Sequence, residues 1–256
     1  MRTDCVIICM KWGTLYGSDY VNVLYHACRR TTPRPFRFIC LTDDSRDLDA
    51  GIESFAIPDI GLEARHYRGG GWPKFAVFGA DLYGLTGRAL FIDLDMVVLS
   101  DLGPLFDHTG RLITTDMGPN WQRKHGNGPP ETGTSIFAFD LGREQPLLAQ
   151  FQGDMDNLVA RHGYEQTVIG VLAPSMDYWP PGWVISFKRH LRRGLMLDLL
   201  VAPAKPLADA KVLAFHGTPR PHELVQKGLW GRFPHLGRGG ISWMVDYWRD
   251  NGGRFD

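Results

Sequence analysis

Residues 88–101 read Arg-Ala-Leu-Phe-Ile-Asp-Leu-Asp-Met-Val-Val-Leu-Ser-Asp, and they are the most informative part of the chain. The apolar run Leu90–Ile92 predicts a buried strand, and a second apolar run begins at Met96. Asp93 and Asp95 stand between the two runs, and on an extended backbone residues i and i+2 point to the same side. Two carboxylates so close to a core are costly unless a cation lies between them. Oxygen ligands suit Mg²⁺ or Mn²⁺, so this pattern predicts a metal site for a phosphate-bearing substrate.

The composition predicts a globular protein with a sizeable core. The chain has 256 residues, of which 44% are hydrophobic, and this length suits one large α/β domain. Its 28 Lys and Arg residues balance its 28 Asp and Glu residues, so the charge does not favour a nucleic-acid partner. No apolar run is long enough to span a bilayer, and acidic Asp4 argues against a signal peptide. We therefore expect a cytoplasmic protein whose four cysteines, which lack zinc-site spacing, are buried reduced thiols.

The alternation of apolar runs and amphipathic stretches predicts an α/β fold with a mostly parallel central sheet flanked by helices. Strands are expected at 4–10, 36–41, 52–57, 90–92, 112–115, 135–139 and 212–215. Helices are expected at 18–30, 74–82 and 145–162, and a long loop at 118–134. Ligands of such sheets bind beyond the carboxyl ends of the strands. The polar residues that follow four of the predicted strands are therefore expected to converge on one side of the sheet.

Three motifs occur in a recognisable order along the chain. Lys74 begins a predicted helix 19 residues ahead of the first aspartate of Asp93-Leu94-Asp95, and residues 215–221 read Phe-His-Gly-Thr-Pro-Arg-Pro. In this order they resemble the motifs of nucleotide-sugar glycosyltransferases of the GT-A fold, and most closely family 8, the glycogenin and lipooligosaccharide galactosyltransferase group. The resemblance covers residues 4–222. The last motif departs from the family's H-x-x-G-x-x-K-P pattern, because Gly217 follows His216 directly and Arg220 replaces the lysine.

The resemblance implies roles for individual residues, and each role stands as an expectation. The metal ion, Mn²⁺ or Mg²⁺, would be held by Asp93, Asp95 and His216. Catalytic positions near the donor sugar would be Asp93, Asp95, Glu165 and Gln166. The donor nucleotide and its diphosphate would be bound by Cys9, Met10, Lys11, Tyr16, Asp43, Asp44, Lys74, Leu94, Gly217 and Arg220.

The activity implied by the resemblance is metal-dependent transfer of a sugar from a nucleoside-diphosphate sugar, expected to be a UDP-sugar, with retention of configuration. The acceptor would be a glycan or a lipid-linked glycan. We expect a single domain over 1–256, in which residues 1–175 form the nucleotide-binding core. Residues 176–256 would form the acceptor side, with a small C-terminal extension, and return His216 to the metal.

Other interpretations stay open at this point. The sequence Phe91–Val97 also imitates the motif of haloacid-dehalogenase phosphohydrolases, in which Asp93 would be the nucleophile and Asp95 the acid and base. A nucleotidyltransferase is a second alternative, but the loop at 11–17 lacks its glycine pattern. A non-catalytic nucleotide-sugar-binding protein of the same fold is a third. Contact with a membrane surface also stays open, because of the basic run 188–193 and the aromatic stretch 243–248.

Overall fold

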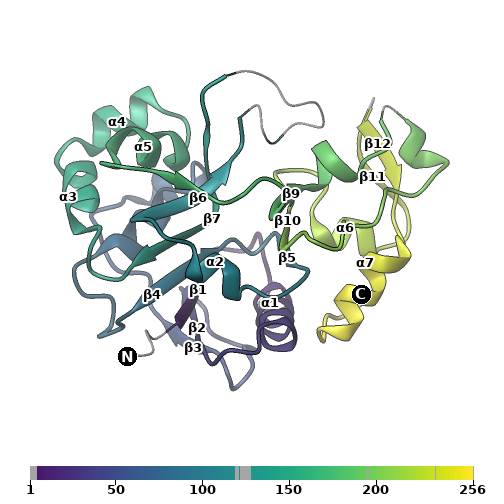
Figure 1. Ribbon diagram of the computed structural model, residues 1–256, viewed down its shortest axis with the longest axis horizontal. Coiled ribbons are helices and arrows are strands. Elements are labelled where there is room, and N and C mark those ends of the chain that lie inside the picture. Colours follow the sequence, from purple (N-terminus) through teal and green to yellow (C-terminus); the bar gives the residue numbers. More distant parts are fainter. Residues whose placement is uncertain (1–4, 119–120, 122–127, 195, 234, 256) are drawn as a thin grey trace.

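The computed structural model describes residues 5–118, 121, 128–194, 196–233 and 235–255. Its centre is a seven-stranded sheet in the order β3-β2-β1-β4-β7-β6-β8 (Figure 1). The strands are β1 (Cys5–Lys11), β2 (Arg37–Thr42), β3 (Glu53–Phe55), β4 (Arg88–Ile92), β6 (Leu112–Asp116), β7 (Thr132–Asp140) and β8 (Asp177–Tyr178). Strand β7 runs antiparallel to its neighbours β4 and β6, and the other adjacent pairs are parallel. The mostly parallel sheet expected from the sequence is thus confirmed.

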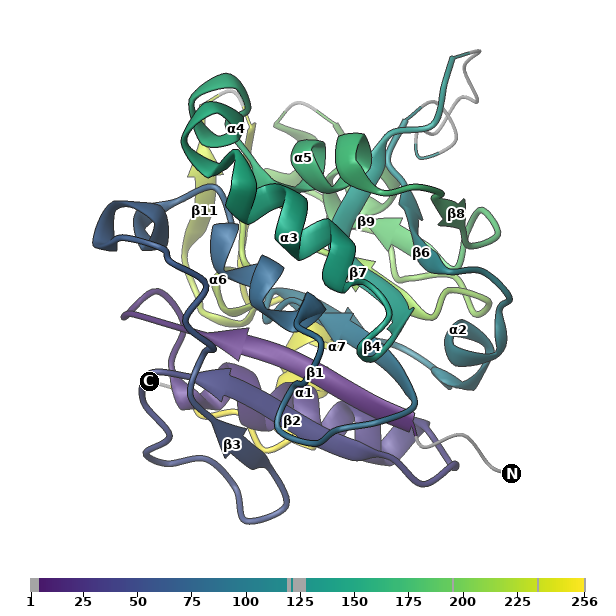
Figure 2. The same cartoon turned by 90° about the vertical axis from the view of Figure 1, so that its left-hand side faces the viewer.

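Helical segments cover both faces of this sheet (Figure 2). They are α1 (Ser18–Thr31), η1 (Ala64–Arg68), η2 (Trp72–Phe78), α2 (Gly103–Asp107), α3 (Gln145–Gly153), α4 (Met155–Arg161) and α5 (Glu165–Leu172). Alternate side chains of β1 enter two different cores, as the two-residue period of a strand requires. Ile7 and Cys9 pack on the side of α1, whereas Ile8 and Met10 pack on the side of η2, α3 and α5.

Three local predictions differ from the structure. The helix expected at 74–82 is the shorter 3₁₀ segment η2, which begins next to Pro73 and ends at Gly79. The helix expected at 145–162 is divided into α3 and α4 at Gly153 and Asp154, two residue types that weaken helices. The predicted long loop ends earlier than expected, because β7 already begins at Thr132.

After β4 the chain continues into a second, smaller sheet. After the turn at Asp93, strand β5 (Met96–Val98) pairs with β10 (Val212–Ala214), which in turn pairs with β9 (Val184–Ser186). The backbone N–H of Phe215 donates to the Asp95 carbonyl at 3.2 Å. A segment more than a hundred residues later in the chain therefore lies directly beside Asp95.

The C-terminal part forms a separate group of elements at one end of the molecule (Figure 1). It contains the π-helical turn η4 (Phe187–Leu191), η5 (Leu197–Leu199), α6 (Pro221–Val225), the antiparallel hairpin of β11 (Leu229–Arg232) and β12 (His235–Arg238), and α7 (Ser242–Asp250). Within the described part of the chain, no helix combines the length and apolar character that crossing a bilayer would need.

Candidate active site

A cavity of about 730 Å³ opens beyond the carboxyl ends of β1 and β4, where open α/β sheets bind their ligands. Its lining brings together side chains from loops and elements far apart in the sequence. Eight of the residues singled out from the sequence line it: Met10, Tyr16, Lys74, Asp93, Leu94, Asp95, Glu165 and Gln166. The predicted convergence of four strand ends therefore holds for β1 and β4, whereas the polar residues after β2 and β10 lie outside the lining.

Lys74 is the centre of the most buried ionic cluster in the cavity. Its Nζ lies 2.7 Å from Asp93 Oδ2 and 2.9 Å from Glu165 Oε1, and the Lys74 and Glu165 side chains are only 8% and 7% exposed. Thr134 completes the cluster, because its carbonyl accepts from Lys74 Nζ at 3.3 Å and its hydroxyl donates to Glu165 at 2.6 Å. The cation beside Asp93 in this structure is thus a lysine ammonium.

Burial and charge act in opposite directions on the ionisation of these groups. Burial alone would lower the pKa of Lys74, but the attraction of Asp93 and Glu165 more than offsets it, so its pKa is raised and the amine stays charged. Burial raises the pKa of Asp93, and the nearby charge of Lys74 only partly counteracts this. Asp95 also raises the pKa of Asp93, so the two carboxylates lie close enough to repel each other.

Asp95 has a different environment from Asp93. Its Oδ2 accepts a hydrogen bond of 3.0 Å from the Tyr16 hydroxyl, and the Arg220 guanidinium lies 5.5 Å from the centre of the Tyr16 ring. Burial raises the pKa of Asp95, and the hydrogen bond from Tyr16 and the charges of Lys74 and Arg220 oppose that shift. No described carboxylate forms an ion pair with Arg220, which lies outside the lining of the cavity but whose positive charge lowers the pKa of Asp95.

His216, the predicted third metal ligand, does not join the two aspartates in this structure. Its Nε2 is 2.8 Å from Ser186 Oγ, and its ring lies 5.5 Å from that of Trp121. Burial, followed by the charges of Lys188 and Arg189, lowers the pKa of His216 to about 4, which keeps the ring neutral. The described residues contain no group of three His, Cys, Asp or Glu placed to hold a metal ion.

The donor set therefore fits a divalent ion only in part. Asp93 and Asp95 supply partly buried carboxylates whose pKa values are raised, and a bound Mg²⁺ or Mn²⁺ would stabilise their negative charge. The backbone of the segment that carries His216 is bonded to Asp95 through Phe215, but the His216 ring is turned toward Ser186.

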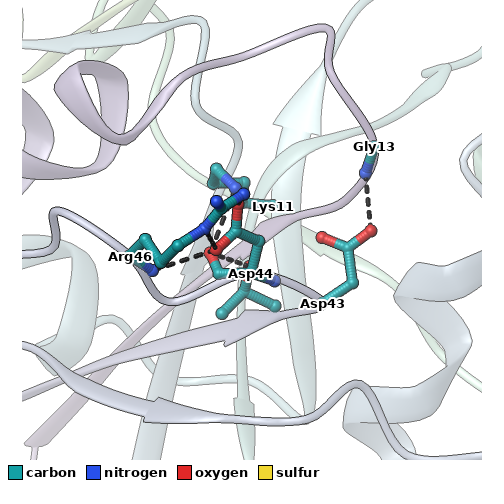
Figure 3. Close-up of polar contacts among 6 residues, drawn as sticks. Lys11, Gly13, Asp43, Asp44 and Arg46 are labelled. Carbon is teal, nitrogen blue, oxygen red and sulfur yellow. Dashed lines mark hydrogen bonds and ion pairs between the residues drawn. The ribbon is translucent and has the colours of Figure 1, made fainter.

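The acidic pair after β2 lies outside the lining of the cavity and shapes a loop (Figure 3). Asp43 Oδ2 accepts from the Gly13 N–H at 2.8 Å, which fixes the loop that carries Tyr16. Asp44 pairs with Arg46 at 2.8 Å, and this hydrogen-bonded contact lowers the pKa of Asp44. Lys11 is buried and donates to the Asp44 carbonyl at 3.1 Å.

Two further residues that were predicted to bind the sugar-nucleotide donor also lie outside the lining of the cavity. The Cys9 thiol is fully buried in the core on the side of α1, and burial, followed by the neighbouring Cys40, raises its pKa. Gly217 is exposed and has a left-handed φ of 72°. All four cysteines are free thiols, and Cys9, Cys28 and Cys40 are buried as expected, whereas Cys5 is only half-buried.

The sequence did not single out Thr134, Arg68 or Gly71 as site residues. Arg68 is exposed and lines the cavity from the end of η1, which carries no motif. The run of three glycines was the available signal for Gly71, which has φ of 73° and lies against Glu165. A Cβ at position 71 would lie 2.4 Å from Glu165 Oε2, so this close approach requires glycine.

The substitution Gly71→Ala is expected to destabilise the fold by about 1–3 kcal/mol, because it combines a strained φ with displacement of Glu165. Equilibrium unfolding in urea measures the loss. Gly69→Ala is the matched control, since Gly69 has an extended φ of 177° and open space around its Cβ position. Equal free energies of unfolding for the two variants would contradict the packing of Gly71 on Glu165.

Comparison with known proteins gives a consistent structural answer. No family model matches the chain, and no curated protein sequence does either. Among solved structures, the galactosyltransferase LgtC, crystallised with donor and acceptor sugar analogs, matches with a TM-score of 0.62 and 14% identity over 96% of this chain and 95% of its own. The chain has the GT-A glycosyltransferase fold. It resembles the family 8 group anticipated from its motifs.

Two other glycosyltransferases match this GT-A chain over nearly its whole length. The bifunctional glycosyltransferase WbbM matches with a TM-score of 0.62 and 11% identity over 98% of this chain, which spans 50% of WbbM. GlyE of Streptococcus pneumoniae TIGR4 matches with a TM-score of 0.59 and 11% identity over 99% of this chain, which spans 61% of GlyE. The common core of these proteins is therefore present here.

Proposed function

We propose that this protein is a glycosyltransferase that moves a sugar from a nucleoside-diphosphate sugar, with UDP as the preferred nucleotide, to a glycan or lipid-linked acceptor. One observation carries the proposal: the cavity beyond β1 and β4 joins Lys74, Asp93, Asp95 and Glu165 in one charged site. The similarity to solved glycosyltransferases over almost the whole chain supports the same class of reaction. In this proposal residues 1–175 bind the donor, and residues 176–256 form the acceptor side.

A divalent ion, Mn²⁺ or Mg²⁺, is part of the proposal. Asp93 and Asp95 would hold it, and His216 would have to leave Ser186 to join them. When bound, such an ion stabilises the negative charge of the leaving diphosphate as a Lewis acid. The neutral state of the His216 ring suits the role of a ligand, because a protonated imidazole cannot bind metal.

The other side chains of the site have separate roles in this proposal. Arg220, which has no described carboxylate as an ion-pair partner, would form charge-assisted hydrogen bonds with the diphosphate. Lys74 is already neutralised by Asp93 and Glu165, so its role is to position these two carboxylates. Glu165 and Gln166 line the cavity on the side where the donor sugar would lie. We propose retention by front-face substitution, in which the leaving phosphate accepts the proton of the acceptor hydroxyl.

The phosphohydrolase alternative receives no support from the site. The solved structures that match nearly the whole chain are glycosyltransferases, and more than 80 residues precede Asp93, whereas the phosphohydrolase motif opens its domain. A non-catalytic sugar-nucleotide-binding protein of the same fold stays the competing candidate, since binding and transfer use the same cavity.

Titration calorimetry of a panel of nucleoside diphosphates, with and without Mn²⁺, tests the proposal. UDP is expected to bind at least about tenfold more tightly with Mn²⁺, which corresponds to about 1.4 kcal/mol. Equal affinity in both conditions would contradict metal dependence, and no binding of any member would contradict the function. Nucleotide-sugar binding without turnover of any donor would favour the non-catalytic alternative. An inverted product in NMR of the anomeric proton would exclude retention.

A further inference from the structure

The positive charge of the chain is concentrated in its C-terminal lobe, defined here as residues 186–240. This stretch contains ten Lys and Arg residues against three Asp and Glu residues, although the whole chain has 28 of each. One of the three acids, Asp198, is buried and accepts a 2.7 Å hydrogen bond from Arg192, so it adds little negative charge to the surface. The lobe therefore presents a basic exterior that the net charge of zero conceals.

A hollow in the lobe gathers part of this charge. It has a volume of about 710 Å³ and is lined by residues of η4, the loop after it and the hairpin β11–β12. The described lining includes no Asp or Glu. Its basic members are Lys188, Arg189, Arg232 and His235, together with Arg192, whose charge is balanced by the buried Asp198. Such a hollow favours an anionic group.

Large apolar side chains are exposed beside this basic hollow. Leu200 is 85% exposed, and Phe233, at the turn of the hairpin and in the wall of the hollow, is 76% exposed. Leu197, in η5, and Val201, which follows η5, are exposed as well. The segment η5 packs against β12. One exposed apolar residue is ordinary, but a group of them beside concentrated charge marks an interaction surface.

We propose that this surface docks the protein on a bilayer that contains anionic phospholipid. Leu197, Leu200, Val201 and Phe233 would enter the boundary between headgroups and acyl chains, which favours apolar and aromatic side chains. The exposed Arg193, Arg232 and Arg238 would lie at the level of the lipid phosphates, and the hollow would hold one headgroup phosphate. The surface lies at the far end of the molecule from α3 and α4 (Figure 1).

The same surface fits a nucleic acid less well. A single-stranded nucleic acid needs aromatic platforms for its bases, whereas three of the four apolar residues proposed to insert are aliphatic. Each aliphatic side chain that inserts among acyl chains strengthens binding to the membrane by about tenfold or more. The combination of aliphatic tips and arginines is therefore complementary to an anionic membrane.

Sedimentation with vesicles tests this proposal on the full chain, without any sugar nucleotide. The protein is expected to partition at least about tenfold more strongly into vesicles of equal parts phosphatidylglycerol and phosphatidylcholine than into phosphatidylcholine alone, and less strongly as salt rises. The double variant Leu200→Glu, Phe233→Glu should lose at least about tenfold of that partitioning. The double variant Arg232→Ser, Arg238→Ser should lose about fivefold per charge.

Matched controls lie on the opposite side of the molecule. Val171→Glu changes an apolar residue that is 63% exposed on α5, and Arg161→Ser removes an exposed charge on α4, so both should leave partitioning unchanged. Equal binding to both kinds of vesicle, or equal losses in the control variants, would overturn the proposal. Binding to a single-stranded RNA oligonucleotide without binding to vesicles would also overturn it. Because no nucleotide is present, these results are independent of the outcome for the proposed transfer reaction.

Discussion

Replacing Lys74 by methionine is expected to remove several kcal/mol of folding stability together with sugar transfer. The Lys74 ammonium contacts both Asp93 and Glu165 within 2.9 Å, and the substitution leaves the buried Glu165 and the partly buried Asp93 without a cation. Removing one partner of a buried ion pair costs about 3–5 kcal/mol. Equilibrium unfolding in urea measures the stability, and turnover of the donor measures the activity.

The loss of stability in Lys74→Met should depend on pH in a defined direction. Burial raises the pKa of Asp93 even beside Lys74, and without the lysine this pKa lies further above that of an unfolded carboxyl, which is about 4. As the pH falls from 8 to 5, the folded variant takes up protons more readily than the unfolded chain, so its deficit relative to the wild type should shrink. A deficit that grows toward acid pH would contradict the charge arrangement described here.

A second substitution separates charge balance from activity. Adding Glu165→Gln to Lys74→Met reduces the unpaired buried carboxylates from two to one, and it should recover about 1–2 kcal/mol without restoring transfer. Lys227→Met removes an exposed lysine and serves as the control, with an expected change within about 0.5 kcal/mol. If Lys74→Met proved as mild as Lys227→Met, the proposed positioning role of Lys74 would be wrong.

Local patterns predicted the frame of the site well. The apolar residues before Asp93 correctly predicted strand β4, which ends at Ile92. The α/β alternation predicted that this end of the strand lies at the ligand-binding edge of the sheet. The extended geometry assumed for the pair was wrong in detail, because the Met96 N–H donates to the Asp93 carbonyl at 3.2 Å in a turn. The two carboxylates nevertheless lie close together across this turn, because Asp95 raises the pKa of Asp93, and their role as metal ligands stays a prediction.

Contacts between distant segments could not be predicted from the sequence. Lys74 meets Glu165 and Thr134 only because η2, α5 and β7 pack together, and no spacing in the chain encodes that meeting. Whether Cys9 or Met10 lines the cavity was equally hidden, since a strand buried on both faces shows no polar alternation. The orientation of the His216 ring toward Ser186 depends on packing in the small sheet.

Replacing Asp95 by asparagine is expected to abolish the metal dependence of UDP binding and to make the metal-free protein more stable. Burial raises the pKa of Asp95, so its ionised form costs stability at neutral pH, whereas an amide keeps an oxygen that accepts from Tyr16 without the buried charge. A gain of about 1 kcal/mol would raise the melting temperature by about 2–4 °C. Loss of a metal ligand should lower the transfer rate at least about 100-fold, or about 2.7 kcal/mol.

The dependence on pH distinguishes this explanation from a general effect of removing an acid. Because the folded pKa of Asp95 lies above the unfolded one, the cost of its ionisation is present at pH 8 and disappears as the pH falls below about 4. The stability gain of Asp95→Asn should disappear with it. Asp44→Asn is the opposite case, since pairing with Arg46 lowers the pKa of Asp44, and it should give no gain at any pH. A fall in melting temperature for Asp95→Asn without metal, or tighter binding of UDP with Mn²⁺ than without it in that variant, would show that Asp95 is a structural acid and that the metal lies elsewhere.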